Sequence, residues 1–141
     1  MAVEGETPLR RVRFSIDSPV ISIAQITSMM GFEPDRAVAV GQIPPGSVLR
    51  KPASCNTWEI VESGDDSSNV DEMLQRVYGR LGGRRETIRS LRDGGCTILV
   101  SVIQHIAPGD RLGPGFSLDF AMIEFMAFVG VELDIAQYLI E

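Results

Sequence analysis

The side chain best suited to acid–base chemistry is the single histidine, His105. An imidazole changes its charge near neutral pH and can act as a general base or acid. Ser101 precedes it by four residues, but the run from Cys96 to His105 is typical of an extended strand. Four residues of strand span about 13 Å, too far for a serine–histidine hydrogen bond. The pattern therefore favours no catalytic pair, and we lean against an enzyme.

The sequence offers little support for a metal site or a phosphate-binding loop. Cys55, Cys96 and His105 do not make up a structural zinc site, so we expect free thiols, no metal and no cofactor. A phosphate loop needs a helix after its glycines, so that the free N–H groups face the anion. The helix expected here precedes Gly31, and Pro34 forbids its continuation.

Asp35 and Arg36 form a charged pair in the corner that follows Gly31. Loops carry function disproportionately, so this corner is a candidate ligand site together with the adjoining 41–56 loop. The alternative is a turn residue beside a surface arginine, joined by a weak ion pair. The sequence leaves both interpretations open.

Alternating and helical spacings indicate the elements that must position these side chains. Polar and apolar residues alternate from Arg11 to Asp17, which predicts a half-buried strand. Ser22 is a suitable N-cap for a helix that ends at Gly31. The same reasoning predicts strands over 37–40, 57–62, 96–105 and 131–135, a helix over 70–81, a helical piece around Ile88 and Leu91, and a helix over 118–129 capped by Ser117.

This order predicts an α+β fold with a single antiparallel sheet and helices on one face. We expect a ferredoxin-like split βαβ core, with the first and third strands as central neighbours, plus a C-terminal helix and strand. We expect one domain over 1–141, with a flexible N-terminus over 1–9. The glycine- and proline-rich segment 107–115 is either a lid or a connector.

Strand alternation also predicts which side chains face away from the helices. Trp58 is expected in the core, while the opposite face is expected to carry Arg13, Ser15, Asp17, Glu59, Leu99, Ser101, Ile103 and His105. Such a face can simply be solvated. The large apolar residues Leu99 and Ile103 favour a covered face, with a second copy or another protein as partner.

The composition excludes several classes of partner. The net charge is -6, whereas a nonspecific nucleic-acid binder needs a basic face. No apolar run approaches the length of a membrane span, and no basic start followed by an apolar stretch suggests a signal peptide. We therefore expect a cytoplasmic protein that binds neither membranes nor nucleic acid.

Several short motifs also look familiar in their order and spacing: Arg13-Phe14-Ser15-Ile16, Gly31-Phe32-Glu33-Pro34-Asp35-Arg36, Val40-Gly41, the lone Trp58, Gly94-Gly95-Cys96 and Leu133-Asp134-Ile135. Together they resemble the bacterial domain of unknown function 4279 family over Arg11 to Tyr138. The resemblance implies a small bacterial α+β domain with no established activity and no catalytic residues to carry over. The family's usual basic or aromatic residue before the strand glycine is replaced here by Ala39 and Val40.

The sequence favours a non-enzymatic protein-interaction or regulatory module, including an immunity-type protein. Its candidate binding residues are Asp35, Arg36, Arg13, Ser15, Glu59, Ser101, Ile103 and His105. The alternative is a small-molecule-binding protein or enzyme whose site lies near Asp35, Arg36 and the 41–56 loop. A flat face with central apolar residues would favour the first hypothesis, and a deep polar pocket the second.

Overall fold

The computed structural model describes residues 9–65, 68–106 and 115–139. In chain order the elements are β1 Arg10–Ser18, α1 Ile23–Met30, β2 Arg36–Val38, β3 Asn56–Gly64, α2 Val70–Leu81, α3 Arg85–Asp93, β4 Thr97–Ile106, α4 Phe120–Val129 and β5 Glu132–Leu139. The segments expected to be a flexible N-terminus (1–9) and a lid or connector (107–115) lie outside the described residues, apart from Leu9 and Gly115. None of these helices is both long and apolar enough to cross a membrane.

The described strands form one sheet in the order β2-β3-β1-β4-β5. β1 lies antiparallel between β3 and β4, and β2 lies antiparallel to β3, so the expected pairing of the first and third strands is confirmed. β5 runs parallel to β4, so the expectation of a purely antiparallel sheet is wrong and the sheet is mixed. The physical reason is α4, a helical crossover that returns the chain to the end of the sheet where β4 began.

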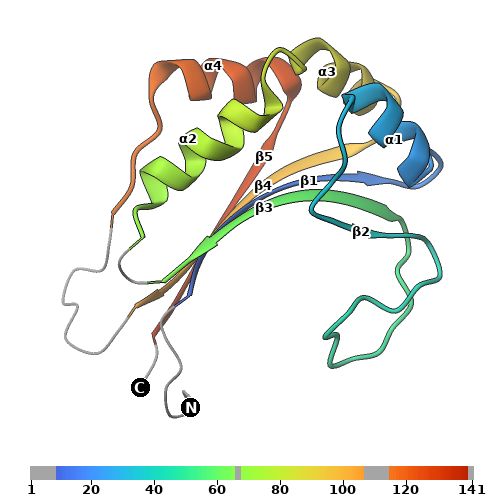
Figure 1. Cartoon of the computed structure of the whole chain (residues 1–141), viewed down its shortest axis with the longest axis horizontal. Coiled ribbons are helices and arrows are strands. Elements are labelled where there is room, and N and C mark those ends of the chain that lie inside the picture. The colour runs from blue at the N-terminus through green and yellow to red at the C-terminus, as the bar shows by residue number, and fades with distance from the viewer. Residues whose placement is uncertain (1–8, 66–67, 107–114, 140–141) are drawn as a thin grey trace.

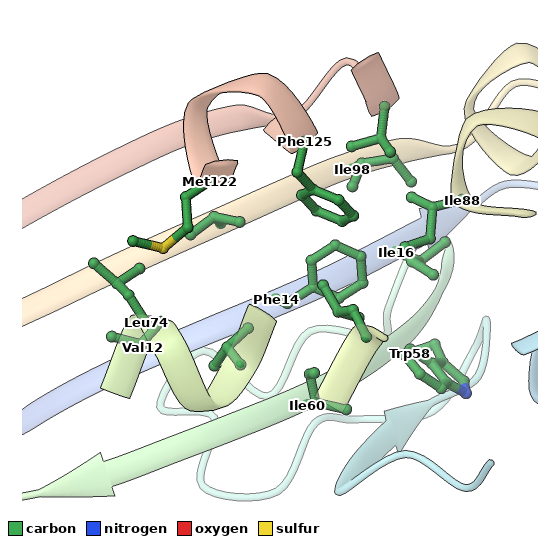
Figure 2. Packing of buried hydrophobic residues seen from close by; sticks show 14 of the residues in the cluster. Val12, Phe14, Ile16, Trp58, Ile60, Leu74, Ile88, Ile98, Met122 and Phe125 are labelled. Atoms are coloured by element: carbon green, nitrogen blue, oxygen red, sulfur yellow. The ribbon is translucent and has the colours of Figure 1, made fainter. Parts of the chain in front are cut away.

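The four described helices lie on one side of the sheet (Figure 1). The buried side chains of β1 that face them are Val12, Phe14 and Ile16, and the alternation of the strand is the cause. Figure 2 shows Met122 and Phe125 of α4 pointing towards this layer. The expected α+β architecture with helices on one face is therefore present, and the ferredoxin-like assignment stays a prediction.

Local capping chemistry sets the helix ends. The Ser22 side chain accepts a hydrogen bond from the Gln25 N–H, and the Gln25 side chain accepts one from the Ser22 N–H. Gly31 ends α1 with a φ of 81°, a left-handed conformation that favours glycine. At α4 the expected cap was wrong, because Asp119 rather than Ser117 caps the helix and accepts from the Met122 N–H.

Trp58 of β3 is an internal anchor, as predicted. Its side chain is fully buried, and its indole Nε1–H donates to the Thr27 hydroxyl at 3.1 Å. The Phe32 ring meets it edge-on, with ring centroids 5.4 Å apart. The segment after α1 is thereby held against the sheet just before β2 begins.

We expect Phe14→Ala to lower the free energy of unfolding by about 3–5 kcal/mol, because it empties a fully buried site in the central strand. Val48→Ala is the control, since Val48 is 94% exposed and its truncation should change stability by no more than about 0.5 kcal/mol. Urea unfolding followed by circular dichroism measures both values. Similar losses in the two variants would contradict this placement of the core.

Candidate functional site

The face of the sheet opposite the helices, called the open face below, carries most of the residues singled out from the sequence. On β3, Glu59 lies opposite Ser15 of β1 on one side and opposite Arg36 of β2 on the other. Arg13 lies opposite Ser101 of β4. Strand pairing thus brings together five side chains from four strands.

Arg13, Arg36 and Glu59 form a charged group on this face, called the Arg–Glu cluster below. The Glu59 side chain is only 7% exposed, and its Oε2 lies 3.6 Å from the Nε of Arg13. At this distance the two side chains form an ion pair, but the two atoms are too far apart for a hydrogen bond. Among the described residues, Glu59 Oε2 and both arginine Nε atoms are buried without a hydrogen-bond partner. Buried polar atoms without hydrogen-bond partners are uncommon in folded proteins and reduce stability, so this cluster is a candidate site.

Ile103 and His105 lie further along the open face of β4. The backbone N–H of His105 donates to the Leu9 carbonyl at 2.8 Å. Its ring meets Tyr138 of β5 edge-on, with centroids 5.8 Å apart. The half-buried imidazole therefore lies against the exposed Tyr138 ring and is not part of the Arg–Glu cluster.

Asp35 does not join the open face but ties the start of β2 to α2. Its two carboxylate oxygens accept hydrogen bonds from the Arg80 guanidinium at 2.6 and 2.8 Å. One of them also accepts from the Val61 N–H at 2.7 Å, beyond the point where β2 stops pairing with β3. Arg80 makes a second ion pair, with Glu62 at 3.4 Å. The two residues of the Asp35–Arg36 corner therefore differ in role: Asp35 holds β2 to α2, and Arg36 lies on the open face.

The hydrogen bonds from the Arg80 side chain hold the pKa of Asp35 below its ordinary value of 3.8. The Val61 N–H acts in the same direction, and burial opposes both. The backbone N–H of Met122 likewise lowers the pKa of Asp119, the α4 cap. Both carboxylates are therefore charged at neutral pH, and both charges are used in local structure.

Two hollows among the described residues are lined by other residues than those of the Arg–Glu cluster. An apolar cavity of about 20 Å³ lies between α2, α4 and β4. A polar groove of about 690 Å³ lies where α3 and α4 end, and its lining includes Arg92, Asp93, Thr97 and Glu132.

Within the described ranges, no group of three or more histidine, cysteine or acidic side chains could hold a metal ion. Cys55 and Cys96 are free thiols, as expected, and Cys96 is buried.

The sequence interpretation missed an exposed apolar surface on α4 and β5. This α4–β5 surface consists of Phe120 and Ile123 of α4 with Leu133, Ile135 and Leu139 of β5. A signal was present, because α4 is apolar around almost its whole circumference, a pattern typical of a helix covered on all sides. Phe120 is nevertheless 78% exposed.

We expect Asp35→Asn to lower the free energy of unfolding at pH 7 by about 1 kcal/mol, a modest loss because this ion pair is partly solvated. The folded-state pKa is depressed, so the stabilisation is present above pH 3.8 and is lost as the pH falls through the lower value. Urea unfolding at pH 7 and at about pH 3 should show the gap between variant and wild type shrinking.

Glu33→Gln provides the matched control, because Glu33 is an exposed acid two residues before Asp35. A gap that stayed constant as the pH fell, or an equal effect of Glu33→Gln, would contradict the role assigned to Asp35.

Comparison with known proteins places the chain in a family without assigning it a role. The family model described as Domain of unknown function (DUF4279) matches residues 7–140. No curated protein and no solved structure shows significant similarity to the chain. The match covers nearly all of the sequence, as the motif order indicated. The chain therefore belongs to the DUF4279 family of domains of unknown function.

Proposed function

We propose that this protein is a non-enzymatic protein-interaction module that docks through its α4–β5 surface. The observation that supports it best is the outer edge of β5. This strand of eight residues pairs with β4 on one side only, and it ends the sheet. Its exposed apolar residues include Ile135 at 48% and Leu139 at 80%.

A bare strand edge presents a row of N–H and C=O groups that fit another strand. Proteins usually protect such an edge with lysine, proline or a bulge. The sequence of β5, ELDIAQYL, has no lysine and no proline. The side chains and the backbone of this edge are therefore both suited to a protein partner.

α4 extends the same surface above the sheet. Glu124 and Phe128 turn towards α3, where Arg85 pairs with Glu124 and lies over the Phe128 ring. The helical period places Ile123 on the side of α4 that faces away from Phe128. Ile123 therefore lies on the flank of α4 directed away from α3, whereas Phe120 lies one turn before Glu124 and opposite the buried side of the helix; both are exposed.

A second copy of the chain is the occupant that this surface fits best. Two β5 strands related by a two-fold axis must pair antiparallel about one central residue. The axis is then perpendicular to the sheet, so both helical layers lie on the same side and the two α4 helices approach each other. The apolar side chains of β5 and α4 would be buried together.

The charges on β5 allow this self-pairing when the axis passes near Ala136. Leu133 would then lie opposite Leu139 of the partner subunit, and Asp134 opposite Tyr138 of the partner subunit. Glu132 and Asp134 would not face acids of the second copy, an arrangement that avoids the cost of opposed like charges. Charge and apolar character therefore favour the same register.

The small-molecule alternative near Asp35, Arg36 and the 41–56 loop receives less support. The Asp35 carboxylate is already engaged by Arg80 and Val61. Residues of the loop close on each other, since the Gly41 N–H donates to Ala53 O and the Ala53 N–H to Gln42 O. These contacts occupy groups that a ligand at this corner would need.

The proposal includes two features of the whole molecule. The strand order β2-β3-β1-β4, with antiparallel neighbours, supports a ferredoxin-like core over 10–106 within a single domain. The free thiols Cys55 and Cys96 support a reducing, cytoplasmic location. An immunity-type role falls within the same class of function.

Sedimentation equilibrium tests the proposal with point variants. The wild type should approach twice the monomer mass of 15.4 kDa at concentrations up to about 100 μM. Ile135→Lys and Leu139→Lys should each remain monomeric, because they place a charge at the centre and at the end of the interface. Val48→Lys is the matched control, since it also charges an exposed aliphatic residue but lies in the segment between β2 and β3.

A wild type that stayed monomeric over this range would overturn the second copy as occupant. If an unrelated protein then co-purified with the wild type but not with Ile135→Lys, the interaction module would stand with a different partner. Equal weakening by Val48→Lys would contradict the location of the surface.

A further inference from the structure

We infer that the Arg–Glu cluster is a binding site for an oxyanion, that is, a carboxylate or phosphate group. This inference goes beyond the proposed function and does not depend on it, because the cluster lies on the open face over β1, β2 and β3, away from the β5 edge. Even with Glu59 ionised, two guanidinium groups leave an excess of positive charge.

Glu59 is placed to position the arginines. It lies on β3 between the strands that carry the two arginines, and its side chain is more than nine-tenths buried. Its Oε2 approaches the Nε of Arg13, which is also buried. A carboxylate that lies on the Nε side of a guanidinium leaves its two terminal nitrogens for another acceptor. The Arg13 side chain is partly exposed, so an anion can reach it.

Arg36 supplies the second cation. It lies directly opposite Glu59 in the register, where a cross-strand ion pair would be expected. The described residues nevertheless offer it no ion pair, and its buried Nε has no acceptor there. An arginine held in this way lacks a partner that an oxyanion would supply.

Two serines lie in the same rows of the open face as the cluster. Ser15 lies opposite Glu59, and Ser101 lies opposite Arg13. Both serines are buried, and both are hydroxyl donors of a kind that often completes an anion site. The cluster therefore combines two guanidinium groups with two hydroxyl groups on paired strands of the sheet.

An NMR titration of the arginine side chains provides the test. The Nε–H signals of Arg13 and Arg36 are followed while sodium phosphate, and separately sodium acetate, replaces sodium chloride at constant ionic strength. We expect both signals to shift, with a dissociation constant of about 1 mM for the tighter anion. The tighter of the two probes identifies the ligand as a phosphate or a carboxylate.

Variants distinguish a built site from general attraction. Arg36→Gln and Arg13→Gln should each weaken binding at least about tenfold. Arg11→Gln is the matched control, because Arg11 lies on the same strand and the same face, two residues from Arg13. Equal weakening by Arg11→Gln, or the absence of any shift in the Arg13 and Arg36 signals, would overturn the inference.

Glu59→Gln tests the positioning role most sharply. Attraction by net charge alone predicts tighter anion binding in this variant, because a negative charge is removed. A carboxylate that holds Arg13 predicts weaker binding instead. Tighter anion binding by Glu59→Gln would therefore overturn the positioning role of Glu59. If this variant fails to fold, the loss of anion binding in Arg36→Gln remains the test of the binding site.

Discussion

The structure depends on a sheet that is covered by helices on one face only. Every second residue of β1 enters the core beneath those helices, and Phe14 lies at its centre. The intervening residues must then face away, which places Arg13 and Ser15 on the open face. Burial of the apolar half of the strand therefore fixes the position of the polar half, and a one-residue shift in register would exchange the two.

Two surfaces with different chemistry follow from this arrangement. Over the middle of the sheet, the open face carries charged side chains that cross-strand pairing draws together around Glu59. At the end of the sheet, β5 has a neighbour on one side only, and α4 stands beside it with exposed apolar residues. The Asp35–Arg80 pair belongs to neither surface, because it fastens β2 to α2 at the opposite end of the strand order.

Patterns local in the sequence predicted much of the fold. The alternation of β1, the Ser22 cap, the Gly31 stop and the buried Trp58 were all foreseen, because each depends on a few neighbouring residues. The direction of β5 was not foreseen, since period-two spacing is the same in parallel and antiparallel strands. The Asp35–Arg80 bond joins residues 45 positions apart, so no local pattern shows it. Exposure of α4 was missed because an apolar helix normally indicates burial.

Hydrogen exchange of the β5 amides tests the central claim, which is docking of a second copy along this edge. Amides that point outward from an unpaired edge exchange freely, whereas amides paired with a second strand are protected. Our account predicts that protection over Glu132–Leu139 rises with protein concentration, while protection in β1 stays constant. Outward-pointing amides of β5 that exchange equally fast at every concentration would contradict it.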